Sequence, residues 1–277
     1  MLVIAAQSFR EMFRKKVFVL VILLTLAFLA LYGTGLYFAN KNGPPDAMYR
    51  NIMLTQLYSA GLYFASFINA FLVVVASAGT ISGEIENGTL YAIVPKPLKR
   101  GEIVLGKFVG LGIMLGVYSA AFFSSILLLN QLASSWGLSF LTPQGLVKAL
   151  LLFCLQPIVL LGVGMWGTTF LPTIGNGILL VMLYGLGMIG GIMEQLGTVM
   201  HNATLVKIGI ISSLIMPTDA VYRKMVGSLF GTGAINFLTS GPFGGITKPS
   251  VWMVVYTLLY IGLFVYLAVR RFGTRDI

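Results

Sequence analysis

Two glutamates stand close together in the segment Ser82–Leu90, between two long apolar runs. Glu84 and Glu86 form a charged island in a chain of which only 9% of the residues are charged. Acid–base catalysis by this pair would require burial, and a solvated loop does not supply it. Charged side chains are also unfavourable in the hydrocarbon core of a bilayer, so the island does not stabilise a membrane span. We therefore expect the island to contact a partner protein in the cytoplasm.

A second candidate for chemistry is the segment Gly101–Lys107, which fits the pattern G-x-x-x-x-G-K. A phosphate-binding loop needs Ser or Thr next, to hold magnesium, and here Phe108 follows. Such a loop also needs a preceding strand, whereas this segment runs into an apolar span. The sequence instead predicts a helix start, with Lys107 reaching toward the membrane surface. We therefore expect no ATP hydrolysis by this chain alone.

The chain has one histidine and one cysteine, which limits the catalytic and metal sites that it can form. His201 is the sole histidine, so neither a histidine-based triad nor an H-E-x-x-H zinc motif can be built within one chain. Cys154 is the sole cysteine, so the chain can form no internal disulfide and no cysteine cluster for a metal. We predict no catalytic residue, no metal site and a small buried thiol.

The elements around these residues are membrane spans. Hydrophobic residues make up 57% of the 277, and the apolar runs are about as long as a helix needs to cross a bilayer. The sequence predicts an all-α polytopic membrane protein, a single transmembrane domain over 1–277. The six predicted spans are Val17–Ala39, Leu57–Thr80, Phe108–Asn130, Ala149–Leu171, Gly177–Leu196 and Val251–Val269.

Lysine and arginine predict the orientation. The segment before the first span, the loop 81–107 and the tail 270–277 hold four, four and three of these residues, against seven on the other side. Excess positive charge marks the cytoplasmic side. We therefore expect both termini to lie in the cytoplasm. The membrane is expected to be the plasma membrane of a prokaryote. The net charge of +10 fits this bias and contact with anionic lipid, and it predicts no nucleic-acid partner.

Residues 1–16 form an amphipathic pattern. Phe9 and Phe13 fall on the apolar face at helical spacing, while Arg10 and Arg14 fall on the opposite face. This pattern predicts a surface helix lying on the cytoplasmic leaflet. Two interpretations stay open: a plain membrane anchor, or an elbow helix that also contacts the partner.

The loop 81–107 carries a family resemblance. Glu84, Glu86, Gly88-Thr89-Leu90, Pro95, Lys99-Arg100, Glu102-Ile103 and Gly106-Lys107 together resemble the first cytoplasmic loop of ABC transporter permeases of the type-2 exporter superfamily. Within it, size and the pattern Pro217-Thr218-Asp219 with Tyr222-Arg223 resemble the NosY-like permeases. The resemblance implies a coupling helix that docks on an ATPase subunit. The implied coupling residues are Glu84, Glu86, Asn87, Gly88, Thr89, Leu90, Pro95, Lys99 and Arg100.

The resemblance also implies partners. Two cytoplasmic ATPase subunits would bind ATP and Mg²⁺, and this chain would hold no cofactor. A second copy, or a homologous permease, would complete an export pathway. Two other functions stay open: a membrane anchor or assembly protein that transports nothing, and a channel or secondary carrier. The cargo also stays open among a lipid, a peptide, a drug and a sulfur compound.

Polar residues near the spans are few. Asn69, Glu194 and Gln195 are candidates for a substrate path or gate, with hydrogen bonding between helices as the alternative for Asn69. The segment 197–250 predicts short extracytoplasmic helices that dip into the membrane or lie on it. Asp219 and Arg223, four residues apart, could form an exposed pair worth a few tenths of a kcal/mol. The glycine pairs Gly106/Gly110, Gly112/Gly116 and Gly187/Gly191 predict close helix packing, within or between subunits.

Overall fold

The computed structural model describes residues 2–14, 16–43, 46–86, 88, 100–133, 142–230, 247 and 249–274. Throughout this part of the chain the regular elements are helices, and no strand is found. They are α1 (Leu2–Arg14), α2 (Lys16–Lys41), α3 (Ala47–Ser77), α4 (Ser82–Glu86), α5 (Arg100–Ala133), α6 (Pro143–Gly167), α7 (Thr173–Val199), α8 (Ala203–Ile215), α9 (Thr218–Leu229) and α11 (Val251–Gly273).

Six helices among the described residues are long and apolar enough to cross a membrane: α2, α3, α5, α6, α7 and α11. The predicted all-α polytopic fold is therefore confirmed. Most helices begin before the predicted spans, because polar first turns continue the same helix. The helix α3, for example, begins at Ala47, ten residues before the predicted span. The predicted ends of two spans are wrong: α3 ends at Ser77, before Thr80, and α6 ends at Gly167, before Leu171.

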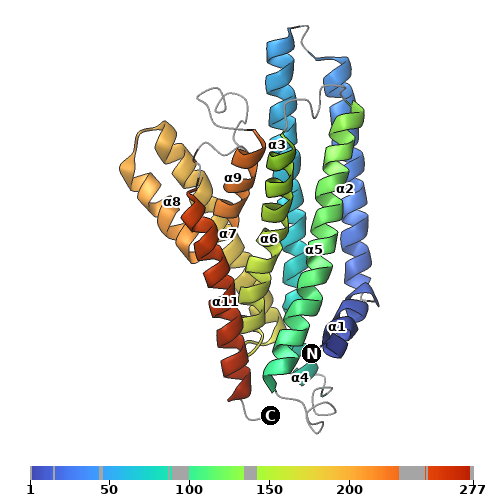
Figure 1. The fold of residues 1–277 in the computed structure, drawn as a ribbon, viewed down its shortest axis with the longest axis vertical. Helices are drawn as coiled ribbons and strands as arrows, with labels where there is room; N and C mark the ends of the chain where they lie inside the picture. The colour runs from blue at the N-terminus through green and yellow to red at the C-terminus, as the bar shows by residue number, and fades with distance from the viewer. Residues whose placement is uncertain are drawn as a thin grey trace.

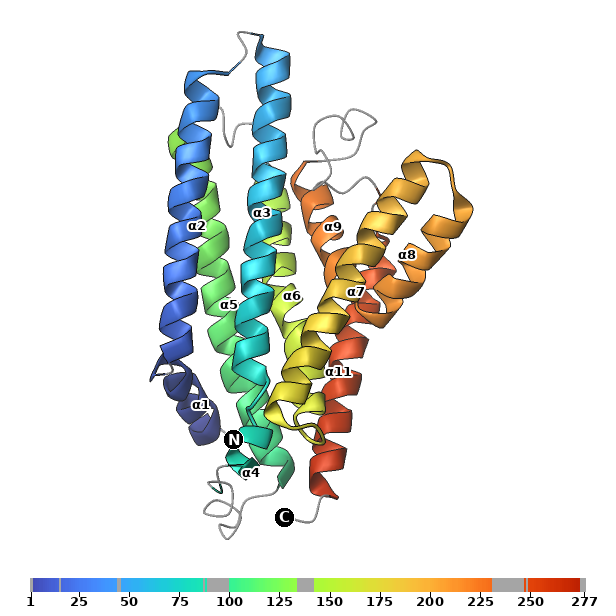
Figure 2. The same ribbon diagram turned by 180° about the vertical axis from the view of Figure 1, so that it is seen from behind.

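Both chain termini lie at one end of the molecule, together with α1 and α4 (Figure 1). We call this the terminal end. The connection between α2 and α3 lies at the opposite end, and the turn from α7 to α8 also points toward that end (Figure 2). The helices α2, α3 and α5 run side by side, whereas α7 and α8 lean away from them in both views.

Local signals in the sequence explain the turn from α7 to α8. His201 has a φ of 52°, and the Asn202 N–H donates to the Gly197 carbonyl at 2.8 Å, as in a Schellman cap. The Asn202 side chain then caps α8 by accepting from the N–H groups of Thr204 and Leu205. The sole histidine is therefore a turn residue.

The helices α8 and α9 form a re-entrant hairpin. They meet at Pro217 with a bend of 105°, and α9 returns toward the end from which α8 starts (Figure 2). The sequence predicted short helices here, and α8 and α9 confirm this for residues 203–229. Residues 231–246 lie outside the described residues.

Burial is greatest in the middle of the bundle. The central helix α6 has completely buried side chains such as Phe153 and Leu161, while α2 exposes Leu23, Leu26 and Leu31. A helix that is apolar on its exposed face fits a position against lipid. The span α6 therefore forms the centre of the packing, and α2 lies on its outside.

The orientation is testable with two cysteine variants in a Cys154→Ala background. Ala203 and Thr274 are exposed, and they lie at the start of α8 and after the end of α11. With cytoplasmic termini, an impermeant maleimide added to intact cells should label Ala203→Cys but not Thr274→Cys. Cell lysis should make both react equally. Labelling of Thr274→Cys alone in intact cells would invert the orientation.

Candidate functional site

The short helix α4 is attached to the ends of several spans at the terminal end. Its start is fixed by Thr168, which follows the last turn of α6. The Thr168 Oγ1 accepts from the N–H of Ile81 at 3.2 Å and of Ser82 at 2.9 Å, and it donates to Ser82 Oγ at 3.0 Å. These bonds satisfy backbone donors that a helix start leaves unpaired. The helix α4 thus begins on α6.

Glu84 connects α4 to α5. Its carboxylate forms an ion pair with Lys107, whose side chain is 6% exposed. The Lys107 ammonium also donates to the Thr80 carbonyl at 2.6 Å. The prediction that Lys107 reaches toward the membrane surface is therefore wrong. The Glu84 carboxylate on α4 and the Thr80 carbonyl after α3 hold its ammonium in the interior. A partly buried pair of this kind is screened less by salt than a surface pair.

Glu86 connects α4 to α7. Its two carboxylate oxygens accept from the backbone N–H and the Oγ1 of Thr173, at 3.0 and 3.1 Å. Thr173 is the first residue of α7. A carboxylate at a helix N-terminus is favoured by the unpaired N–H groups and by the helix dipole. Both glutamates of the charged island therefore bind elements of their own chain.

The remaining predicted coupling residues fall around α4. Gly88 has a φ of 72°, which glycine adopts without strain, so the predicted turn is confirmed at this residue. Arg100 is the first residue of α5. The other coupling residues, Asn87, Thr89, Leu90, Pro95 and Lys99, lie outside the described residues, and their role stays a prediction.

The segment Gly101–Lys107 is helical throughout, as the first two turns of α5. A phosphate-binding loop instead curves its backbone N–H groups around the phosphates. Here those groups lie along a helix, and Lys107 points to Glu84 and Thr80. This geometry agrees with the interpretation of the segment as a helix start.

The amphipathic helix α1 packs against α5. Ala5, Ser8 and Met12 are its buried stripe, whereas Arg10 is exposed and Phe13 is half exposed. The Phe13 ring contacts the rings of Phe9 and Phe18, with centroids 5.0 and 4.7 Å apart. The predicted surface helix is confirmed as a helix with one buried face. Arg14 is its last residue.

One glycine sets the distance between α1 and α5. A Cβ built on Gly110 would lie 2.4 Å from the Ala5 carbonyl oxygen, whereas one on Gly116 meets nothing within 4 Å. Gly110→Ala should therefore displace α1 and lower stability by about 1–3 kcal/mol. Gly116→Ala, on the same helix, should be neutral or slightly stabilising. Thermal unfolding of the two purified variants checks this, and equal melting temperatures would contradict the close packing.

A buried charge cluster lies at the re-entrant hairpin. Arg223 on α9 is 1% exposed. Its Nε donates to Asp219 Oδ2 at 2.8 Å, and its terminal nitrogens contact Glu194 of α7 at 2.8 Å. Further contacts reach Ser213 of α8, at 3.2 Å, and Thr247. We call Glu194, Asp219 and Arg223 the charge cluster.

The prediction that Asp219 and Arg223 form an exposed pair is therefore wrong about their exposure. The pair forms at the predicted spacing, but it is buried, because α7 and α8 cover this face of α9. Glu194 belongs to the same network and is no isolated acid at a membrane surface. Burial makes the three residues interdependent, since each charge is desolvated and needs its partners.

Two glycines of α7 allow the hairpin of α8 and α9 to pack closely against this helix. A Cβ on Gly191 would lie 1.7 Å from Asp219 Oδ2, and one on Gly187 would lie 3.0 Å from the Met216 carbonyl oxygen. Of the two uses predicted for the pair Gly187/Gly191, packing within one subunit is the one observed. The small residues let α9 approach α7 closely enough for the charge cluster to form.

Asn69 lies between helices inside the bundle. Its Nδ2 donates to Ser119 Oγ of α5 at 2.7 Å, so the alternative of hydrogen bonding between helices is confirmed. Its Oδ1 has no hydrogen-bond partner among the described residues, and neither has the Oε1 of Gln195, which is also buried.

Two small cavities adjoin the Asn69 side chain and Asp219. Their volumes are about 10 and 20 Å³, and both are lined by Ser66, Gln156, Tyr184 and Thr218. Such volumes suffice for about one water molecule each. This part of the interior is therefore closed in the conformation described.

Several residues of these two sites were not singled out from the sequence. Lys107 was considered in a rejected motif and in the family pattern of the loop, with no partner predicted for its charge. Thr168 and Thr173 carry no spacing signal. Arg223 was considered in a surface pair and in the NosY-like pattern, with no burial predicted. A basic residue within an apolar chain that holds few charges is itself a signal for a buried partner.

Comparison with known proteins defines the class. The family model described as ABC-2 family transporter protein matches residues 2–277, so the chain belongs to this family. The six helices that are long and apolar enough to cross a membrane agree with a multi-span membrane protein of this family.

Two curated relatives narrow the comparison. Both carry the name "Probable ABC transporter permease protein NosY". The protein from Stutzerimonas stutzeri is 42% identical over 53 residues, 19% of this chain and 19% of that protein. The protein from Pseudomonas aeruginosa is 36% identical over 61 residues, 22% of each. The chain thus aligns with about a fifth of the length of these relatives, and the similarity agrees with the NosY-like pattern in the sequence.

Proposed function

We propose that the chain forms the substrate pathway of an ATP-driven exporter. Two copies, or one copy with a homologous permease, would line the pathway. Two cytoplasmic ATPase subunits would bind ATP and Mg²⁺ and would push on α4 and on residues 87–99. The observation that carries this proposal is the attachment of α4 to α5, α6 and α7 through Lys107, Thr168 and Thr173.

A load on α4 would reach the charge cluster through α7. Thr173, which Glu86 contacts, begins this helix, and Glu194 in its last two turns contacts Arg223 of the hairpin. The rise between these two residues is about 30 Å, close to the thickness of a bilayer core. We propose that α7 moves as one unit, so that displacement of its first turn would shift Glu194 in its last two turns and with it the charge cluster.

The experiment that tests this function co-expresses the chain with an ABC ATPase encoded by a neighbouring gene, whose presence is itself part of the test. We expect the two to co-purify, and ATP hydrolysis in proteoliposomes to depend on the ATPase. The permease purified alone should show no hydrolysis. A stable complex without hydrolysis-dependent transport of any lipid, peptide, drug or sulfur compound would favour the anchor or assembly role. Transport without any ATPase would favour a carrier.

A further inference from the structure

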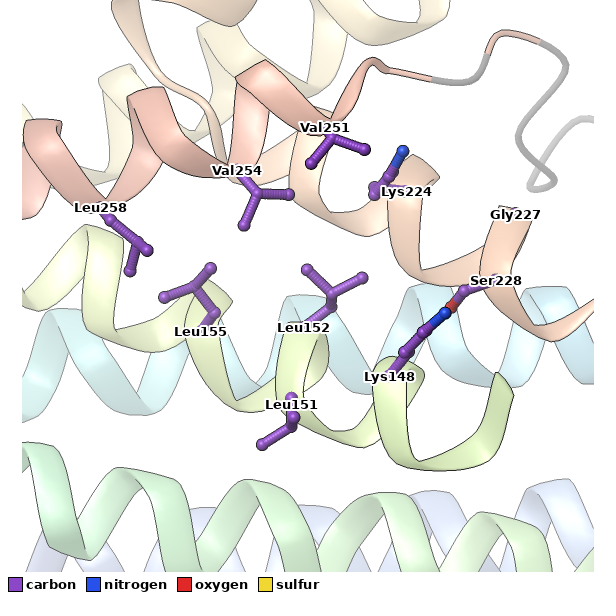
Figure 3. Close-up of a pocket in the computed structure, with 10 residues that line it drawn as sticks. All are labelled: Lys148, Leu151, Leu152, Leu155, Lys224, Gly227, Ser228, Val251, Val254 and Leu258. Carbon is purple, nitrogen blue, oxygen red and sulfur yellow. The ribbon is translucent and has the colours of Figure 1, made fainter. Parts of the chain in front are cut away.

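An elongated groove lies between α6, α9 and α11, away from the charge cluster. Figure 3 shows its side chains, and its volume is about 680 Å³. This is within the range of about 300–1,000 Å³ that is typical of ligand sites. Its walls are branched apolar side chains, mainly Leu152 and Leu155 of α6 and Val254 and Leu258 of α11. The groove is thus much more apolar than a site for a water-soluble ligand.

Two lysines line the same end of this groove from different helices. Lys148 of α6 is exposed, and Lys224 of α9 donates to the Pro249 carbonyl at 2.8 Å. In Figure 3 both are at the end where α11 begins with Val251, and the apolar side chains continue from there to Leu258. Since Lys224 has three N–H donors, two remain for a ligand.

The groove extends over about two thirds of the hydrocarbon depth of one leaflet, which is about 15 Å. Val251 and Leu258 are separated by seven residues of α11, a rise of about 10 Å. Val251 is the first residue of this span, so the lysines are at the level of the membrane surface and the leucines lie in the hydrocarbon. A cationic mouth above an apolar groove complements an anionic head group above an acyl chain.

A second copy of the chain fits this charge pattern poorly. The chain has eight acidic residues, and the described ones away from the terminal end are Asp46, Glu194 and Asp219. The last two already bind Arg223. A second copy could therefore offer the lysines only Asp46 among its described carboxylates.

We propose that this groove binds an anionic phospholipid of the surrounding leaflet. The lipid phosphate contacts Lys148 and Lys224, and one acyl chain lies along Leu155, Val254 and Leu258. Bound in this way, the lipid connects α6, α9 and α11, and it holds the re-entrant helix α9 against the last span.

The test measures lipid binding to the purified full-length chain in detergent, without an ATPase. Native mass spectrometry should show phosphatidylglycerol bound in preference to phosphatidylcholine. The double variant Lys148→Gln/Lys224→Gln should lose about 30-fold in affinity for phosphatidylglycerol, since each lysine near the surface contributes about fivefold. Lys207→Gln, an exposed lysine on α8, is the matched control and should bind as the unchanged protein does.

A second variant tests the apolar part. Val254→Trp fills the groove but keeps both lysines, and it should also lose phosphatidylglycerol, with a melting temperature in lipid-free detergent close to that of the unchanged protein. Equal binding of the two phospholipids, or unchanged binding by both variants, would overturn the proposal. So would a loss of dimer in the lysine variant in the absence of lipid, because a second copy would then be the occupant. The readout does not involve ATP, so the export function and this site can fail separately.

Discussion

Glu86→Lys is expected to abolish ATP-driven transport while the protein still inserts and folds. The carboxylate of Glu86 accepts two hydrogen bonds from Thr173 at the start of α7. A lysine would place a cation against the positive end of that helix and could accept neither bond. Because Glu86 is exposed, the loss of stability should be limited to about 1 kcal/mol. Both hydrogen bonds of Glu86 to α7 would nevertheless be lost, and of the side-chain hydrogen bonds described between α4 and α7 only that of Ser82 Oγ with Thr173 Oγ1, at 3.1 Å, would remain.

The measurement compares ATPase co-purification with transport-coupled hydrolysis. If Glu86 acts through α7, Glu86→Lys should retain much of the bound ATPase but lose coupled hydrolysis. If it contacts the ATPase directly, co-purification should fall as well, since opposed like charges at an interface can cost several kcal/mol. Wild-type turnover by Glu86→Lys would exclude both roles.

Thr173→Val separates the two routes further. This variant removes the side-chain donor to Glu86, together with the hydrogen bond between Thr173 Oγ1 and Ser82 Oγ, and it keeps the backbone N–H. Combined with Glu86→Gln, its effect on coupled hydrolysis should be non-additive if the two residues act as a pair. Additive effects would place the action of Glu86 outside α7. Each single variant should leave thermal unfolding nearly unchanged.

The spans were predictable because length and apolar composition determine them almost alone. The first residues of the helices were harder to predict. The turn Pro143–Leu146, for example, is polar enough to lie outside the membrane, yet it is the first turn of α6. Thr142 caps the N-terminus of this helix. A hydropathy profile locates the residues that lie in the hydrocarbon core and does not locate the ends of the helix. The predicted boundaries therefore differ most where a helix projects beyond the bilayer.

The site was predictable only in part. Charge in the island pointed to Glu84 and Glu86, but the partners of both glutamates are distant in sequence. Lys107 is 23 residues away from Glu84, and Thr173 is 87 residues away from Glu86. No periodicity relates such positions. The same limit applies to Arg223, whose second carboxylate, Glu194, comes from another helix 29 residues away. Local spacing revealed the pair with Asp219 and gave no sign of its burial.

Arg223→Met is expected to be the most destabilising single change in the hairpin. Arg223 is 1% exposed and lies between two carboxylates. Removing its charge leaves Asp219 and Glu194 desolvated and opposed to each other. Breaking a buried ion pair in this way costs about 3–5 kcal/mol. We therefore expect a strongly lowered melting temperature, poor yield, or both.

The other members of the charge cluster should rank in a defined order. Glu194→Gln leaves Arg223 paired with Asp219, so it should be the mildest change, at about 1 kcal/mol. Asp219→Asn should be intermediate, since Glu194 remains as the counter-charge. Gly191→Ala should act like a cluster variant, because its Cβ would collide with the Asp219 carboxylate. Gly185→Ala is its control on the same helix, with no atom within 4 Å of the added Cβ.

A triple replacement separates stability from function. Arg223→Met combined with Asp219→Leu and Glu194→Leu removes all three charges, and apolar replacement of a buried ion network is often neutral or stabilising. The triple variant should recover most of the stability lost in Arg223→Met, as measured by thermal unfolding. Coupled transport should not recover, because α7 would no longer hold the hairpin through directional bonds. If Arg223→Met alone unfolds like the unchanged protein, the cluster contributes little to stability. If the triple variant transports normally, the cluster is packing and no part of the gate.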